Sequence, residues 1–288
     1  MSVVVPTLNE AENLPHVLAR IPSHYEVILV DGNSTDGTPE VARGLRPDVR
    51  VVKQSRRGKG EALACGFAAA EGDIIVMLDA DGSAQPEEIT RFVDALVGGA
   101  DFAKGSRFVD GGGSSDITRL RRSGNAALSG LVNLLFGTRY TDLCYGYNAF
   151  WRHCLPAIKV DCDGFEVETL INIRAARAGL RIIEVPSFEE SRIHGNSNLR
   201  TFRDGWRVLR TIVRERLERA PDPRVRDAIL AGRSSAEVLG LTQKGSATSA
   251  AAIAPTGGLA DDRSGLSAGR KFSPRLRDAA VAGSTRVK

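Results

Sequence analysis

Cysteine is scarce in this 288-residue chain, which has four, at Cys65, Cys144, Cys154 and Cys162. Because none of them stands in a Cys-x-x-Cys pair, we expect neither a structural zinc site nor a disulfide framework. Long apolar runs are also lacking, and no stretch approaches the roughly 20 residues of a membrane-spanning helix. No basic segment precedes the apolar residues 3–5, so the N-terminus is not typical of a signal peptide. These absences predict a reduced, cytoplasmic protein.

Aromatic residues make up only 6% of the chain, and its formal net charge is a modest +4. The positive charge is concentrated, because residues 192–219 hold eight arginines against three acids. Such an excess suits phosphate groups on a nucleotide, a nucleic acid or a lipid surface. No DNA- or RNA-binding motif occurs, however, and the basic residues do not interleave with aromatics. We therefore expect no nucleic-acid partner.

The first hundred residues alternate between short apolar segments and segments with a helical pattern. We expect strands at residues 2–5, 27–31, 51–53, 74–79 and 100–104, and helices at about 9–20, from 39, over 59–70 and from 86. Strands that alternate with helices across short loops are typical of a mostly parallel sheet covered by helices on both faces. The predicted fold class is therefore α/β.

The pattern changes after residue 107. A glycine-rich loop precedes a helix near 120–136, and then follow a helix at 164–179, a strand at 181–185 and an amphipathic basic helix at about 199–219. We assign residues 1–220 to one domain. Residues 221–288 are rich in Ala, Ser, Gly and Arg, which predicts a low-complexity, disordered tail with at most a short helix near 224–230.

The apolar run Ile74–Leu78 ends abruptly at two carboxylates, Asp79 and Asp81. Since side chains alternate along a strand, both acids leave it on the same side. Two like charges side by side repel unless a cation lies there, and a divalent ion that takes oxygen ligands and binds substrate phosphates suits the pair. An isolated Asp-x-Asp-Gly is more typical of a solvated turn. The rest of the chain must therefore decide between a turn and a metal site.

Polar residues follow three of the predicted strands, at residues 6–10, at Asp31 and at Asp79. In a parallel sheet, equivalent strand ends converge on one crevice, where open α/β sheets bind their ligands. The three strand ends therefore predict a single ligand site.

A series of motifs carries the clearest functional signal. They lie at residues 5–10, 30–38, 57–60, 78–82, 105–108, 141–147, 164–168 and 192–197. In order and spacing, over about residues 2–200, the chain resembles glycosyltransferase family 2, and more narrowly its dolichol-phosphate mannosyltransferase branch. The resemblance implies a GT-A-like, Rossmann-like fold. It also implies inverting transfer of a sugar from a nucleotide-diphosphate sugar to a polyprenyl phosphate lipid carrier.

The resemblance further implies a set of site residues. Nucleotide-sugar contacts are expected from Pro6, Thr7, Asn9, Glu10, Val30, Asp31, Lys59, Asp79, Ala80 and Asp81. Mg²⁺ or Mn²⁺ is expected on Asp79, Asp81 and Ser83, to stabilise the charge of the departing nucleotide. The expected catalytic residues are Asp79, Asp81, Arg107 and Arg192. The acceptor phosphate is expected on Arg121, Arg122 and Arg192, whose planar forks suit phosphates.

Three positions depart from the family pattern. Gly32 replaces the second acid of a pair, Ser83 stands where the branch tends to have a metal-binding Gln, and Asn198 replaces a Lys. These departures bear on the identity of the sugar and on whether the donor is GDP- or UDP-linked, more than on the reaction type.

A second interpretation keeps the fold but uses a hydroxyl acceptor, in exopolysaccharide or glycolipid synthesis. A polyprenyl phosphate oxygen is already ionised near neutral pH, so its attack needs no base, whereas a hydroxyl needs a positioned Asp or Glu. Asp142, Glu166 and Glu168 are available for that role. Glu166 and Glu168 are equally well explained as charges that complement the start of a helix.

The helix at 199–219 combines Phe202, Trp206 and Leu209 with several arginines. This pattern is typical of a helix in a membrane interface, and also of one that packs its apolar stripe on the catalytic domain. A polyprenyl phosphate acceptor would bring the protein to the inner face of the plasma membrane as a peripheral protein. The sequence gives no indication of the oligomeric state.

Overall fold

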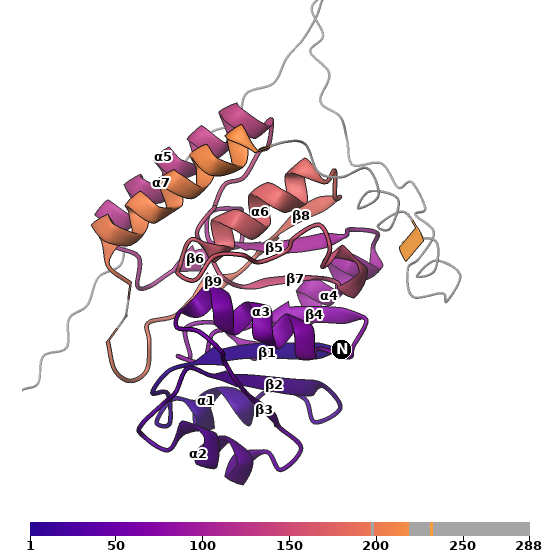
Figure 1. Ribbon diagram of the computed structural model, residues 1–288, viewed down its shortest axis with the longest axis vertical. Helices are drawn as coiled ribbons and strands as arrows, with labels where there is room; N and C mark the ends of the chain where they lie inside the picture. Colours follow the sequence, from indigo (N-terminus) through magenta and orange to yellow (C-terminus); the bar gives the residue numbers. More distant parts are fainter. Residues whose placement is uncertain (197–198, 219–230, 233–288) are drawn as a thin grey trace, which may run out of the picture. The chain divides into compact units, whose positions relative to one another are not determined.

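The computed structural model describes residues 1–196, 199–218 and 231–232 (Figure 1). The chain divides into units 1–246 and 247–288, and the fold described here is that of the first. The predicted tail at 221–288, with its short helix near 224–230, lies outside the described residues except for 231–232. The division of the chain at residue 220 stays a prediction. None of the helices in the described part is both long and apolar enough to cross a bilayer.

A seven-stranded sheet with the order β3-β2-β1-β4-β7-β5-β8 forms the centre of the fold (Figure 1). Its strands are β1 (Ser2–Thr7), β2 (Glu26–Asp31), β3 (Arg50–Lys53), β4 (Ile74–Met77), β5 (Phe102–Ser106), β7 (Asn148–Trp151) and β8 (Ile182–Pro186). All neighbours are parallel except β7, which runs antiparallel to both β4 and β5. A separate parallel pair is formed by β6 (Gly113–Ser114) and β9 (Phe188–Glu189).

Helices connect most of these strands. They are α1 (Leu14–Leu18), α2 (Thr38–Leu45), α3 (Lys59–Ala69), α4 (Ile89–Val97), α5 (Arg119–Phe136), α6 (Val167–Arg177) and α7 (Thr201–Leu217), with 3₁₀ turns at Pro86–Glu88 and Arg152–Cys154. The predicted α/β class with a mostly parallel sheet is confirmed.

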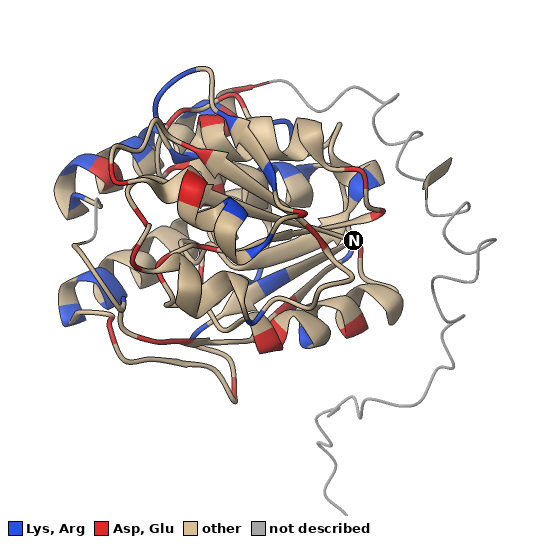
Figure 2. Cartoon of the chain, turned by 90° about the horizontal axis from the view of Figure 1, so that it is seen from below, with Lys and Arg blue, Asp and Glu red and all other residues tan. Residues whose placement is uncertain are grey.

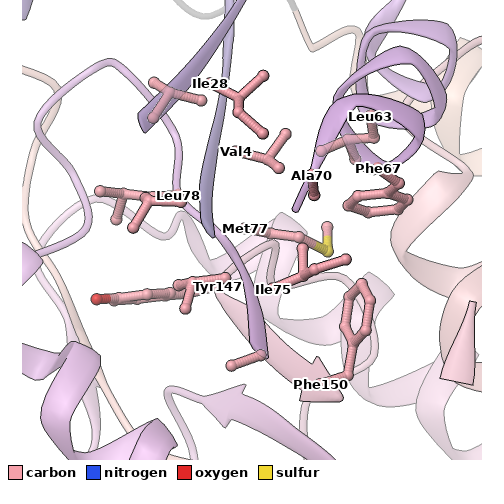
Figure 3. Close-up of a cluster of buried hydrophobic side chains, with 14 of the residues drawn as sticks. Val4, Ile28, Leu63, Phe67, Ala70, Ile75, Met77, Leu78, Tyr147 and Phe150 are labelled. Atoms are coloured by element: carbon pink, nitrogen blue, oxygen red, sulfur yellow. The ribbon is translucent and has the colours of Figure 1, made fainter. Parts of the chain in front are cut away.

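Aromatic contacts show that helices cover both faces of the sheet. Phe67 of α3 packs edge-on against Phe150, with ring centroids 5.3 Å apart, and Phe92 of α4 stacks on Tyr147 at 4.4 Å. Since side chains alternate along an extended segment, Tyr147 and Phe150 point to opposite faces. Figure 3 shows Phe67 and Phe150 on one side of the strands and Tyr147 on the other. Strands buried on both faces explain the continuous apolar runs of β1, β2 and β4.

Strand register brings the predicted polar strand ends together. Thr7 of β1 pairs with Asp31 of β2, and Val4 pairs with Met77 at the end of β4. The segments that follow β1, β2 and β4 therefore leave the sheet at the same edge, as the sequence predicted.

The helix predicted at about 9–20 is wrong in its extent, because α1 covers only Leu14–Leu18. Asn9 has a positive φ of 57°, and the backbone N–H groups of Asn9, Glu10 and Ala11 donate to side chains of residues 34–38 instead of entering a helix. Strand β7 was not predicted. Its pairing with β4 and β5 depends on contacts far apart in the sequence, which local patterns do not record.

Helices α5 and α7 lie side by side (Figure 1), and with α6 they enclose a second, smaller apolar core. It is formed by Val132, Tyr140, Leu143, Ile173, Val208 and Ile212. A buried ion-pair network also ties α7 to α6. The carboxylate of Glu215 accepts from Arg174 at 2.8 Å and from Arg177 at 2.7 Å. This network fixes α7 against α6.

We expect Glu215→Gln to lower the free energy of unfolding by about 3–5 kcal/mol, because it leaves buried guanidinium groups without their shared carboxylate. Glu218→Gln is the matched control at the C-cap of the same helix, since its half-exposed carboxylate lies 3.8 and 3.9 Å from the same two arginines, and it should change that free energy by less than about 1 kcal/mol. Urea unfolding measures both. Equal effects of the two substitutions would contradict a structural role for the buried network.

Candidate active site

A cavity of about 940 Å³ opens at the sheet edge where β1, β2 and β4 end. Most of the residues predicted for the site line it, namely Pro6, Thr7, Glu10, Lys59, Asp79, Ala80, Asp81, Ser83, Arg107, Arg121 and Arg192. Asn9, Val30, Asp31 and Arg122 do not line it. Asp31 instead accepts hydrogen bonds from the backbone N–H groups of Asn33 and Ser34, and so shapes the loop beside the cavity.

Asp79 faces a lysine. The ammonium of Lys59 lies 2.7 Å from Oδ1 of Asp79 and 2.8 Å from Oε1 of Glu168. Burial favours neutral Lys59, but the charges of Asp79 and Glu168 outweigh it and raise the pKa of Lys59 above its usual range. Burial also raises the pKa of Glu168, although Lys59 opposes this. Gly146 permits the cluster, since a Cβ there would come within 3.0 Å of the ammonium.

Asp81 faces an arginine. Its Oδ2 lies 3.1 Å from Arg192, which also donates to Glu10 at 2.9 Å, and its Oδ1 accepts from the Ser83 hydroxyl at 2.6 Å. Burial raises the pKa of Glu10, while the hydrogen bond from Arg192 works against that rise. Arg192 therefore links the first strand end, through Glu10, to the fourth, through Asp81.

Arg107 is held by two further carboxylates. Its Nε and Nη2 donate to Asp142 at 2.7 and 3.0 Å, and its Nη1 donates to Glu189 at 2.9 Å. Burial works to raise the pKa of Asp142, but the hydrogen bonds from Arg107 and the charge of Lys104 hold it below its usual range. All the nitrogens of the Arg107 guanidinium thus donate to carboxylates of the protein itself. We infer that Arg107 holds the cavity wall in place and does not bind a phosphate.

The residues fit a divalent ion of the predicted kind. Asp79 and Asp81 both line the cavity. Oδ1 of Asp81 accepts from both the backbone N–H and the hydroxyl of Ser83, but Oδ2 of Asp81 and both oxygens of Asp79 keep a lone pair beside their contacts with Arg192 and Lys59. Within the described ranges no cluster of three or more His, Cys, Asp or Glu side chains could hold a metal by itself. Mg²⁺ is commonly held by one or two carboxylates, with substrate phosphates and water completing its coordination. The donor set therefore suits an ion that binds together with a diphosphate.

The family's sequence profile for glycosyl transferase family 2 matches residues 2–155, which is more than half of the chain. The chain belongs to glycosyltransferase family 2. The enzyme class predicted from the sequence is therefore confirmed, and the protein is a glycosyltransferase.

Two relatives show where this glycosyltransferase lies within the family. It is 35% identical to a polyprenol monophosphomannose synthase of Mycolicibacterium smegmatis over 76% of this chain and 89% of that protein. It is also 35% identical to an undecaprenyl-phosphate mannosyltransferase of Micrococcus luteus over 68% of this chain and 86% of that protein. The predicted resemblance to the polyprenyl-phosphate branch is confirmed.

A solved structure supports the fold assignment. The glycosyltransferase resembles glucosyl-3-phosphoglycerate synthase from Mycobacterium tuberculosis in complex with Mn²⁺, uridine diphosphate and glucosyl-3-phosphoglycerate. The TM-score is 0.58 and the identity 27%, covering 74% of this chain and 78% of the other. A second complex of that enzyme contains Mg²⁺ and uridine diphosphate, with a TM-score of 0.57 and 26% identity over 74% and 78% of the two chains. The GT-A-like fold is confirmed.

Of the three carboxylates that the sequence suggested as a base, two are paired with cations and the third does not line the cavity. Asp142 is fully buried against Arg107, and Glu168 is buried against Lys59. Glu166 does not line the cavity, and its Oε1 accepts from the backbone of Gly164. The described part of the glycosyltransferase thus offers none of them as a ready base for a hydroxyl acceptor.

Sequence analysis missed some residues of the cavity wall. Glu189 holds Arg107 and lies on β9, a two-residue strand with no recognisable pattern. Tyr145 packs under the same guanidinium, 4.9 Å from its ring centroid. Tyr145 lies within the motif at residues 141–147, whereas no sequence pattern points to Glu189.

The far end of the cavity is apolar. Leu120 and Leu128 of α5 and Phe202, Trp206 and Leu209 of α7 line it. Arg121, paired with Asp116 only at 3.9 Å, lies on the α5 wall. One continuous cavity therefore joins a charged end at the strand termini to an apolar end between two helices.

Proposed function

We propose that this glycosyltransferase moves a sugar from a nucleotide-diphosphate sugar to a polyprenyl phosphate, with inversion at the anomeric carbon. The observation that carries the proposal is the shape of the cavity, in which carboxylates at one end are continuous with an apolar channel between α5 and α7. A lipid phosphate has the same two-part character. The names of the relatives, which refer to polyprenol and undecaprenyl phosphate, support the same acceptor class.

Within the proposal, the loop after β1, with Pro6, Thr7 and Glu10, contacts the nucleotide, while Asp79, Ala80 and Asp81 face its diphosphate. Mg²⁺ or Mn²⁺ bound by Asp79 and Asp81 would supply Lewis-acid neutralisation of the departing diphosphate. Arg121, which lies on α5 and lines the same cavity, holds the acceptor phosphate. Arg192 orients Asp81 and Glu10 and lies close enough to the strand ends to contact a phosphate oxygen.

The acceptor oxygen in this reaction carries a negative charge before it attacks. No proton has to be removed, which agrees with the pairing of Asp142 and Glu168 to cations described above. Attack from the acceptor side, opposite the leaving diphosphate, inverts the anomeric centre.

We further propose that α5 and α7 contact the membrane surface. The two helices expose Leu134, Phe202 and Leu217, each more than 80% accessible, and Trp206, and of these Phe202 and Trp206 also line the open apolar end of the cavity. Arginines interleave with these side chains on α7, as in helices that lie in a membrane interface. This placement would present the open apolar end of the cavity to a lipid acceptor at the inner face of the plasma membrane.

The test supplies the protein with Mg²⁺ or Mn²⁺, a panel of labelled GDP- and UDP-sugars, and a polyprenyl phosphate. We expect label in the organic phase with at least one donor, and none when the free polyprenol, which lacks the phosphate, replaces the acceptor. The stereochemistry of the product, read by NMR, checks inversion. If the lipid stays unlabelled with every donor while a hydroxyl acceptor is glycosylated, the proposal is wrong.

A further inference from the structure

Basic and acidic side chains both occur along most of the described fold (Figure 2), but four arginines gather in the lining of one small cavity. This cavity, of about 400 Å³, lies between the loop before α3, the loop before α6 and the first turns of α7. Arg57, Arg200, Arg203 and Arg207 line it. We call it the arginine pocket. It adjoins the active-site cavity, and Lys59 lines both.

The acids of the arginine pocket leave most of this charge uncompensated. Asp163 is 3.3 Å from Arg56, which does not line the pocket. Asp204 accepts from the backbone N–H of Arg200 at 2.7 Å and lies 3.8 Å from Arg207. In the described part of the chain, Arg57, Arg200 and Arg203 form no ion pair, since no carboxylate oxygen lies within 4.0 Å of their guanidinium nitrogens. Like charges gathered in a concave site repel one another unless an anion neutralises them.

The backbone is shaped to keep these arginines together. Gly58 has a φ of +114°, and a Cβ there would clash with the carbonyl oxygen of Asp163, so the loop carrying Arg57 can lie against the loop before α6. A Cβ on Gly164 would lie 2.6 Å from Nη1 of Arg207. Arg203 and Arg207 are four residues apart and share one face in the first turns of α7, and Arg200 is the N-cap of the same helix.

We propose that the arginine pocket is a second anion site that binds a phosphate group through its arginines, none of which lines the active-site cavity. Guanidinium forks match phosphate oxygens in geometry, and four arginines line a space of about 400 Å³, which is large enough for a phosphate ester. The phosphate comes either from solution, as a free phosphate or soluble ester, or from the head group of an anionic lipid at the surface that α7 faces. The proposal stands on the pocket alone and does not depend on the transfer reaction.

The test compares two double variants of the full chain that remove equal charge. Arg57→Gln/Arg203→Gln alters the pocket. Arg43→Gln/Lys53→Gln is the control, because both residues are exposed, lie on α2 and β3 away from the helices proposed to contact the membrane, and line neither cavity. One arm titrates inorganic phosphate and follows the melting temperature. The other measures sedimentation with phosphatidylcholine vesicles, with and without phosphatidylglycerol.

We expect saturable binding of at least one probe, weakened about tenfold or more by the pocket variant and less than threefold by the control. Saturable binding of inorganic phosphate identifies a soluble ligand, whereas binding only of vesicles with phosphatidylglycerol identifies a lipid head group. Equal losses in the two variants would show that net charge alone is responsible and would overturn the proposal. Absence of binding by the wild-type chain in both arms would also overturn it. The melting temperatures without ligand verify that both variants fold.

Discussion

Asp79→Asn and Asp81→Asn should each lower sugar transfer on the order of 10³-fold, the scale on which the loss of an electrostatic contact to developing charge is felt. Each substitution removes one of the two carboxylates that fit a divalent ion and leaves the rest of the cavity in place. Mn²⁺ affinity, followed by electron paramagnetic resonance, should fall in parallel with activity if the ion binds where we propose.

Little loss of stability is expected from either change, because the facing cations keep other partners. Lys59 retains Glu168 when Asp79 is altered, and Arg192 retains Glu10 when Asp81 is altered. Asp110→Asn is a suitable control, since Asp110 is exposed and does not line the cavity. Transfer that survives both Asp79→Asn and Asp81→Asn in the presence of a chelator would exclude the proposed metal site.

A substitution at Ser83 tests whether this residue binds the ion directly or only supports a ligand. Its hydroxyl donates to Asp81, so in this arrangement it orients a carboxylate. Ser83→Ala should therefore reduce Mn²⁺ affinity less than tenfold, within the range of a lost supporting hydrogen bond. A loss as large as that of Asp81→Asn would instead make the hydroxyl a direct ligand.

The parts of the fold that could be predicted from the sequence are those whose structure is determined by residues close together in the chain. The apolar runs of β1, β2 and β4 are buried on both faces, so their period and length are visible in any short window. The convergence of their ends then follows from parallel pairing alone. Strand β7 has no such signal. It has only four residues, and it is a strand because it pairs with β4 on one side and β5 on the other, both far away in the sequence.

In the candidate site, too, the sequence predicted the residues that stand in local motifs but not the contacts between residues far apart in the chain. Motifs identified Asp79, Asp81, Arg107 and Arg192 as charged residues of one site, and all four line the cavity. Their pairing could not be predicted, since Asp142 is 35 residues from Arg107 and Glu189 is 82 residues away. In the structure Lys59, Arg107 and Arg192 each lie between two carboxylates. The cations that a motif would assign to phosphates are thus first of all counterions of carboxylates inside the fold.

Lys59 is where these two roles can be separated. Lys59→Met should lower the free energy of unfolding by about 3–5 kcal/mol, because it leaves buried Glu168 without its cation. The pKa of Glu168 is already raised by burial above its ordinary value of 4.5, and removing Lys59 should raise it further. A carboxyl group whose pKa is higher in the folded than in the unfolded state makes the protein less stable as the pH rises from the unfolded-state pKa through the folded-state pKa. The deficit of the variant, measured by urea unfolding, should therefore be smallest near pH 4 and grow toward pH 7.

Activity in a double variant then decides what Lys59 does. Lys59→Met/Glu168→Gln removes the unpaired charge and should recover most of the stability lost in Lys59→Met. If Lys59 acts on the diphosphate or holds Asp79 in place, transfer should stay reduced by about a hundredfold or more despite the recovered fold. Glu168→Gln alone is the matched control, since it keeps the contact between Lys59 and Asp79 and should retain most of the activity. Transfer that returns together with stability in the double variant would make Lys59 a structural counterion and remove it from the nucleotide-sugar site.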